Sequence, residues 1–92
     1  MIVWDERKRA SNLAKHGLDF ADAWRVYESL SKLTFESARK GEDRRLDLAT
    51  VENVLLAFVY VEGRNAVRAI SLRRVSRAER RIHEKTIKKE SH

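Results

Sequence analysis

The sequence predicts an α+β domain with two N-terminal helices, an antiparallel sheet of about four strands and a basic C-terminal helix. Three observations lead to this prediction. Apolar residues recur at helical spacing in the first third of the chain, strand-like runs fill the middle, and arginines crowd the end. Because the chain has 92 residues, no proline and three glycines, we expect residues 1–92 to form one domain.

The first predicted helix follows a short extended lead over residues 1–4. Asp5 can cap a helix over residues 6–15, since its carboxylate can accept bonds from free backbone N–H groups. Gly17 suits the left-handed position that follows a helix. The inner face of this helix is expected to comprise three apolar residues, which are Ala10, Leu13 and Ala14.

The second predicted helix starts after Asp19, which is another candidate cap. Four residues then follow at the i, i+3, i+4, i+7 spacing of one buried stripe, and they are Phe20, Ala23, Trp24 and Tyr27. Because aromatic residues at helical spacing are typical of a core, we expect this stripe to pack inside rather than to line a ligand site.

Beyond the helices the pattern changes to that of strands. A short strand is expected over residues 31–35, and a charged, glycine-containing loop is expected over residues 37–43. Residues 44–51 alternate between apolar and charged side chains, which is the pattern of a strand with one buried face.

Residues 54–60 are apolar at every position, which is typical of a central strand covered on both faces. The turn over residues 62–65 contains Gly63 and Asn65, either of which can take a positive φ angle. A further strand is expected over residues 67–72, where the apolar pattern returns.

The C-terminal helix has a recognisable start. Ser76 can cap it, and Glu79 three residues later completes the pattern of a capping box. Its apolar stripe is narrow and comprises Val75, Ala78 and Ile82. Because this stripe does not continue after residue 85, residues 86–92 are expected to fray.

Composition restricts the partners and the chemistry. The net charge of +6 and the isoelectric point of about 10.1 favour nucleic acid or an acidic protein as partner. The absence of cysteine excludes disulfides and thiolate metal sites, and it is compatible with the cytoplasm. No motif for a metal, a nucleotide cofactor or a serine hydrolase occurs. The longest apolar run, residues 54–61, is too short to cross a membrane.

Residues 68–81 carry the strongest functional signal, because a strand-like run passes here into a helix rich in arginine. The planar guanidinium fork suits phosphate oxygens and indicates a site for a phosphodiester backbone. A solvated, salt-bridged basic helix is the alternative. Arg68 and Arg73 have opposite parity in a regular strand. Both can reach one cleft only if the strand bulges near Ser71 or if Arg73 lies beyond its end.

Acid–base groups are few, and histidine is the side chain that titrates nearest to neutral pH. His16 lies at a predicted helix end, where it can instead bond a carbonyl group, and His92 is terminal. His83 can pair with Glu79 one helical turn earlier. Such groups suffice for metal-free cleavage of RNA, in which the substrate's 2′-hydroxyl attacks and arginines stabilise charge. They suffice equally for a protein that only binds RNA.

Several motifs resemble those of the BrnT-type toxins. The opening signature W-D-x-x-K-x-x-x-N-x-x-K-H-G-x-x-F is matched by Trp4-Asp5, Lys8, Asn12, Lys15-His16-Gly17 and Phe20. Further on, the family's E-x-R, its R-I-I-S-A-R-R and its late glutamate resemble Glu42-Asp43-Arg44, residues 68–74 and Glu79, with Ala69 and Leu72 as conservative departures. The resemblance covers residues 2–83 in the family's order, and His83 stands where the family usually has a tyrosine.

The resemblance implies a type II toxin, which is a ribosome-independent ribonuclease with a fold similar to RelE toxins. It also implies a ribbon-helix-helix, BrnA-like antitoxin, through which alone the protein would meet DNA. The catalytic candidates are Lys15, His16, Arg44, Arg68, Arg73, Glu79 and His83, and the RNA-binding candidates are Lys8, Arg74, Arg77, Arg80 and Arg81. The alternatives are an inactive module of the same fold that binds RNA or antitoxin, and a basic domain that binds an acidic protein surface.

Overall fold

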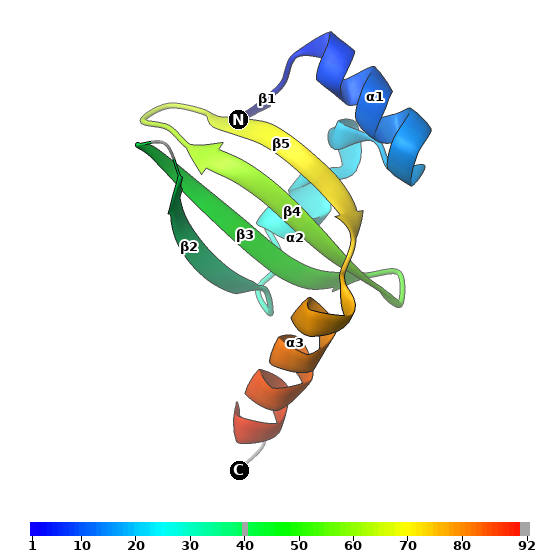
Figure 1. Ribbon diagram of the computed structural model, residues 1–92, viewed down its shortest axis with the longest axis vertical. Coiled ribbons are helices and arrows are strands. Elements are labelled where there is room, and N and C mark those ends of the chain that lie inside the picture. Colours follow the sequence, from blue (N-terminus) through cyan, green and yellow to red (C-terminus); the bar gives the residue numbers. More distant parts are fainter. Residues whose placement is uncertain (40, 91–92) are drawn as a thin grey trace.

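The computed structural model describes residues 1–39 and 41–90, in which five strands form one mixed sheet (Figure 1). In chain order the elements are β1 (Ile2–Val3), α1 (Glu6–His16), the 3-10 helix η1 (Phe20–Asp22), α2 (Trp24–Tyr27), β2 (Leu33–Arg39), β3 (Glu42–Val51), β4 (Val54–Glu62), β5 (Val67–Arg74) and α3 (Arg77–Glu90). The strand order is β1-β5-β4-β3-β2. The predicted α+β class is confirmed, and β4 is the central strand that its apolar run predicted.

The sheet has one strand more than the four expected, and it is mixed rather than antiparallel. The additional strand, β1, pairs in parallel with β5, with Ile2 opposite Val67 and Val3 opposite Arg68. The other neighbouring strands pair antiparallel. A strand of two residues has no alternation from which a partner can be predicted, so the sequence indicated only an extended lead.

The loop expected over residues 37–43 is largely part of a hairpin, so that prediction is wrong. Strands β2 and β3 continue through the charged residues to a turn at Gly41, whose φ angle is 75°. Opposite charges face one another across these strands, as in the ion pair of 3.6 Å between Arg45 and Glu36. Such pairs allow a charged segment to form strands. Lys40 lies outside the described residues.

The turn before β5 does not have the predicted backbone. Neither Gly63 nor Asn65 has a positive φ angle, whereas Glu52 and Asn53, between β3 and β4, have φ angles of 49° and 67°. Two such residues in sequence are typical of a tight hairpin turn. Gly63 is required for a different reason. A Cβ atom on it would lie 2.5 Å from the carbonyl oxygen of Ala66.

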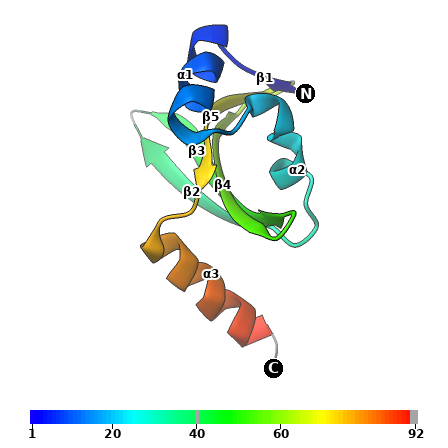
Figure 2. The same cartoon turned by 90° about the vertical axis from the view of Figure 1, so that its right-hand side faces the viewer.

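The main core lies between the sheet and the segment formed by η1 and α2, which covers one face (Figure 2). Its buried members include Phe20, Ala23 and Val26 on the helical side and Leu56, Phe58 and Tyr60 on β4. The predicted stripe is wrong at Trp24, which is 49% exposed. Because the segment begins as a 3-10 helix, every third residue shares a face and Val26 takes the buried position.

A buried carboxylate joins β2, β3 and β4 beside this core. Asp47 is fully buried and accepts hydrogen bonds from Lys32 Nζ at 2.9 Å, Thr34 Oγ1 at 2.7 Å and the Tyr60 hydroxyl at 3.0 Å. Burial and the neighbouring Asp47 raise the pKa of the Tyr60 phenol. The alternation predicted one buried face of β3, whereas Asp47 and Leu48 are both buried on opposite faces.

Helix α1 has both predicted caps, since Asp5 accepts a backbone hydrogen bond at its start and Gly17 ends it with a φ angle of 70°. Its predicted inner face is wrong. The apolar residues of that face are exposed, and they are Ala10, Leu13 and Ala14. The buried residue of the helix is instead Asn12, which is 7% exposed. Hydrogen bonding rather than apolar burial therefore sets the orientation of α1.

Helix α3 begins with the predicted capping box. The Ser76 backbone N–H donates to Glu79 Oε1 at 2.8 Å, and the Glu79 N–H donates to Ser76 Oγ at 3.2 Å. The helix projects away from the sheet (Figure 2), and Ala78 and Ile82 of its expected apolar stripe are exposed. It continues past residue 85 to Glu90. The fraying of residues 86–92 stays a prediction, and residues 91–92 lie outside the described ranges.

Candidate functional site

The register of the sheet places three of the predicted arginines on one face. Arg44 and Arg68 both pair with Val61 of β4, and residues that pair across neighbouring strands share a face. Arg73 pairs with Ala57, which is four residues from Val61 and therefore on the same face. We call these three side chains the arginine face. Figure 1 looks onto this side of the sheet, with α2 behind it.

A bulge in β5 brings Arg68 and Arg73 to the same face. Ser71 pairs with Val59 and Ala69 pairs with Tyr60, so Ile70 is an extra residue without an opposite partner. One extra residue changes the parity of the strand. For Arg68 and Arg73 to share one face, the sequence analysis called for either a bulge near Ser71 or a strand that ends before Arg73. The structure confirms the bulge.

Glu42, at the start of β3, connects two of these arginines. Its Oε2 accepts a hydrogen bond from Arg68 Nη2 at 2.6 Å, and its Oε1 accepts one from Arg44 Nη2 at 3.4 Å. The side chains of Arg44 and Arg68 are 29% and 46% exposed. Within the described ranges Glu42 takes one Nη2 donor from each arginine, and Arg44 Nε is buried without a hydrogen-bond partner. Both guanidinium groups therefore have N–H donors to offer to a further anion.

Arg73 is held by Glu79 of α3 in a bidentate pair, with Nη1 at 2.7 Å from Oε1 and Nη2 at 2.9 Å from Oε2. The hydrogen bonds from Arg73 and from the Ser76 backbone lower the pKa of Glu79 to about 2, against an opposing effect of burial. The same pair raises the pKa of Arg73. At neutral pH Glu79 is thus an anion and a weak base, which fits a residue that orients Arg73 and joins α3 to β5.

A basic pocket lies beside the arginine face, between α1 and β5. Its lining comprises Lys8, Ser11, Asn12, Lys15 and His16 of α1 together with Ile70 and Ser71 of the bulge. Ser71 belongs to the same sheet face as Arg68 and Arg73, because it pairs with Val59. Lys8, Lys15 and His16 of the first helix therefore lie beside Ile70 and Ser71 of the last strand, although about 60 positions separate them in the sequence.

The family of ribonuclease toxins named BrnT, of type II toxin–antitoxin systems, matches residues 4–79. The chain belongs to the BrnT family. The resemblance seen in the sequence is confirmed, and membership in this family implies a ribonuclease toxin of a system that includes an antitoxin. No curated protein matches the chain. The matched range includes the arginine face and the basic pocket and ends at Glu79.

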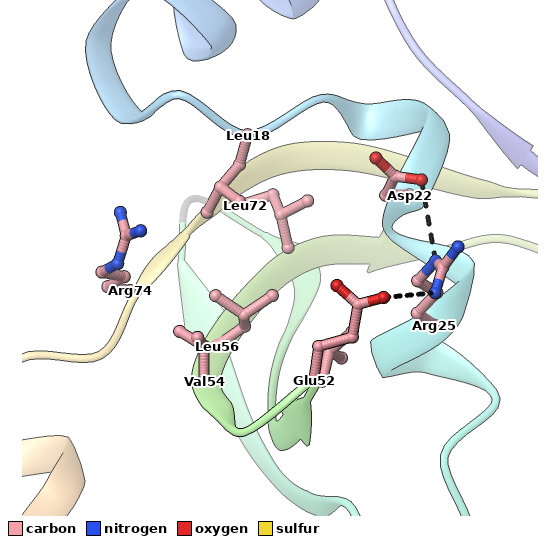
Figure 3. A pocket seen from close by; sticks show the side chains of 9 residues that line it. Leu18, Asp22, Arg25, Glu52, Val54, Leu56, Leu72 and Arg74 are labelled. Carbon is pink, nitrogen blue, oxygen red and sulfur yellow. Dashed lines mark ion pairs between the residues drawn. The ribbon is translucent and has the colours of Figure 1, made fainter.

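The fold of this BrnT protein separates Arg74 from the other candidates. Arg74 pairs with Leu56, so it belongs to the opposite face of the sheet from Arg73. It borders an apolar pocket on that side (Figure 3), whose other charged groups are joined by ion pairs of Arg25 with Asp22 at 3.7 Å and with Glu52 at 3.8 Å. An RNA strand on the arginine face would not reach Arg74 without passing the end of β5.

The remaining candidates lie on α3, beyond or near the end of the family match. Arg77, Arg80 and Arg81 are exposed on this projecting helix. His83 is half-buried, and its predicted pairing with Glu79 does not occur, because Glu79 is bound to Arg73. His92 lies outside the described ranges. In residues 1–39 and 41–90 no group of three or more ligating side chains could hold a metal ion, and no helix could span a bilayer.

Proposed function

We propose that this BrnT-family protein is an endoribonuclease that cleaves RNA without a metal ion, acts in the cytoplasm, and thereby inhibits translation and growth. The observation that carries the proposal is the bulge at Ile70. It puts Arg68 and Arg73 on one face with Arg44 and places Ser71 against the basic pocket of α1. Ser71 thus joins a basic pocket to a face that carries three arginines, and RNA backbones bind to basic surfaces.

The proposed role of Arg44 and Arg68 is to bind the scissile phosphate. They flank Val61 on one face, and Glu42 bonds only one Nη2 of each guanidinium group, which leaves other Nη donors for the phosphate. Glu42 holds the two guanidinium groups in place before RNA binds, which lowers the entropic cost of binding the phosphate. As the 2′-hydroxyl attacks, negative charge grows on the non-bridging oxygens, and fixed guanidinium groups stabilise it. Arg73, held by Glu79, supplies the third positive charge.

Proton transfer is assigned to the basic pocket. His16 lines it and is the proposed base that accepts the proton of the 2′-hydroxyl. The bond between phosphorus and the 5′-oxygen then breaks, and that oxygen takes a proton from Lys15 in the same pocket or from His83 on α3. The products are a 2′,3′-cyclic phosphate and a 5′-hydroxyl end. Lys8 and the arginines of α3 are proposed to bind flanking phosphates.

The antitoxin is proposed to be a ribbon-helix-helix protein whose acidic segment covers the arginine face. The support is the net charge of +6 together with a family that is defined by its toxin–antitoxin pairing. Opposite charge accelerates association of such partners. Contact with DNA would then come through the antitoxin, because the toxin's own basic surface would be covered.

The test is incubation of the purified protein with RNA in excess EDTA, alongside expression of the protein without its antitoxin. We expect cleavage and growth arrest. Arg68→Lys keeps the charge and loses the planar fork, so it should cleave much more slowly than the wild type. Arg64→Lys, in an exposed turn, is the matched control and should be unaffected. Strict dependence on added Mg²⁺ would contradict the mechanism. Tight RNA binding without cleavage would favour the inactive binding module.

A further inference from the structure

We propose that Asn12 is a positioning residue of the ribonuclease, which fixes the basic pocket of α1 against the arginine face of β5. This inference rests on the proposed function. Asn12 touches no phosphate in the proposed mechanism, and its effect on catalysis passes through Lys15 and His16. Its side chain joins the two halves of the site by hydrogen bonds to the backbone between them.

The side-chain amide of Asn12 makes three short hydrogen bonds. Its Nδ2 donates to the carbonyl oxygen of Leu72 at 2.8 Å and to that of Leu18 at 2.9 Å. Its Oδ1 accepts from the backbone N–H of Leu72 at 3.1 Å. Both amide hydrogens are therefore used, and Leu72 has both of its backbone groups bound by one side chain.

The position of this contact explains its geometry. Strand β1 pairs with β5 only as far as Val3 opposite Arg68. Beyond that point the outer edge of β5 has no neighbouring strand, and the buried N–H and C=O groups of Leu72 need partners. An amide offers one donor and one acceptor in the spacing of a backbone peptide group. Asn12 thus takes the place of a strand residue at the edge of the sheet.

Leu72 lies between Ser71, which lines the basic pocket, and Arg73, which belongs to the arginine face. A bond to its backbone therefore fixes α1 at the point where the two parts of the site meet. Ala10 and Ala14 are exposed and Leu13 is 45% exposed, so little apolar surface of α1 is buried there. Its other polar attachment is the pair of Arg9 with Asp19 at 2.8 Å, which binds the helix to η1 rather than to β5.

The test compares the wild type with Asn12→Asp, which keeps the size, replaces both amide donors by a second acceptor oxygen, and adds one negative charge. We expect kcat to fall by about 10- to 100-fold with KM changed by less than about threefold, because a small misplacement of catalytic groups lowers the rate without removing phosphate contacts. Rates are expressed per folded molecule. Asn65→Asp, in an exposed turn, is the matched control and should leave both constants unchanged.

A double-mutant cycle separates positioning from general stability. In a Lys15→Ala, His16→Ala background, Asn12→Asp should lower the residual rate by less than about threefold, since the groups that it positions are absent. Equal losses in both backgrounds would overturn the inference. So would an Asn12→Ser protein and an Asn12→Asp protein that both fail to fold, because Asn12 would then serve global stability alone.

A readout independent of cleavage keeps this inference distinct from the proposed function. In NMR spectra, the ring signals of His16 should shift in Asn12→Ser, which adds no charge, while those of His83 on α3 stay in place. The amide of Leu72 should be protected from hydrogen exchange in the wild type and lose about tenfold or more of its protection in the variant. If the wild type does not cleave RNA, the proposed function fails, whereas unmoved His16 signals and unchanged Leu72 exchange would overturn the positioning role itself.

Discussion

The pair of Arg73 and Glu79 leads to a prediction on stability at low pH. Glu79 ordinarily titrates near 4.5, and in the folded protein its pKa is lowered to about 2 by Arg73 and the Ser76 backbone. A carboxyl group whose pKa is lower in the folded state stabilises that state above its unfolded pKa. This stability is fully present above pH 4.5 and is lost as the pH falls through the range down to about 2.

The magnitude follows from the same values. The difference between 4.5 and about 2 corresponds to at most about 3 kcal/mol in the free energy of unfolding. The side chain of Arg73 is 29% exposed, so solvent screens part of this interaction. We therefore expect the pair to contribute about 1–3 kcal/mol at neutral pH and nothing near pH 2. Glu79→Gln keeps the shape and removes the charge, so it isolates this contribution.

The assay is urea unfolding of the wild type and of Glu79→Gln between pH 7 and pH 2, followed by tryptophan fluorescence and circular dichroism. The pKa of Asp19 is also lowered to about 2 by its hydrogen bond from Arg9, but this effect is common to both proteins and cancels in the comparison. The variant should be less stable at pH 7, and the two curves should converge near pH 2. Parallel curves over the whole range would refute the reasoning.

Two further predictions concern the buried carboxylate and the antitoxin. Asp47→Asn should lower the free energy of unfolding by about 3 kcal/mol, because Lys32 loses its partner and the amide cannot accept all three bonds. Equilibrium unfolding measures this change. Asp43→Asn, on the exposed side of the hairpin, is the control and should change the stability little. The association rate of toxin and antitoxin should fall at least about tenfold as salt is raised, while the affinity should change less, because apolar contacts supply most of it. Stopped-flow mixing at several salt concentrations measures the rate, and a rate indifferent to salt would mean that the antitoxin does not land on the arginine face.

Local rules of backbone geometry carried the sequence predictions that succeeded. Asp5, Gly17 and the Ser76–Glu79 capping box occupy the positions that those rules assign to them. The unbroken apolar run of β4 identified the central strand for a different reason, since successive residues buried on both faces need no polar alternation. The alternation of faces along β5 showed that Arg68 and Arg73 could share a face only with a bulge near Ser71 or with a strand that ended early. It could not choose between these two possibilities.

Two predictions of burial failed where a polar side chain occupies a buried position that the hydrophobic pattern assigns to apolar residues. Asn12 attaches α1 to β5 through Leu72, and no spacing rule indicates that one amide will replace a strand neighbour. Asp47 is buried because Lys32, Thr34 and Tyr60 meet around it, and these contacts depend on the strand register. The sequence named Asn12 only as a member of a family motif, without a physical role.

Some predicted site residues lie together and others do not, again because contacts between distant residues cannot be predicted from local sequence patterns. Register placed Arg73 on the arginine face and Arg74 on the opposite one, which adjacent positions on a strand require. The resemblance could not reveal that Glu79 is bound to Arg73 and is therefore not free for His83. That contact joins a strand end to the first turn of the next helix, and its geometry is set by the path of the chain between them.

The most direct test of the account is cleavage of one RNA oligonucleotide in excess EDTA, compared with the same oligonucleotide carrying a single 2′-deoxy substitution at the cleaved position. The account predicts that the unmodified RNA is cut to a 2′,3′-cyclic phosphate and a 5′-hydroxyl end, because its own 2′-hydroxyl is the nucleophile. It predicts that the substituted RNA binds with similar affinity and stays intact. Cleavage of the 2′-deoxy substrate at the same position would contradict the proposed chemistry of the arginine face and the basic pocket.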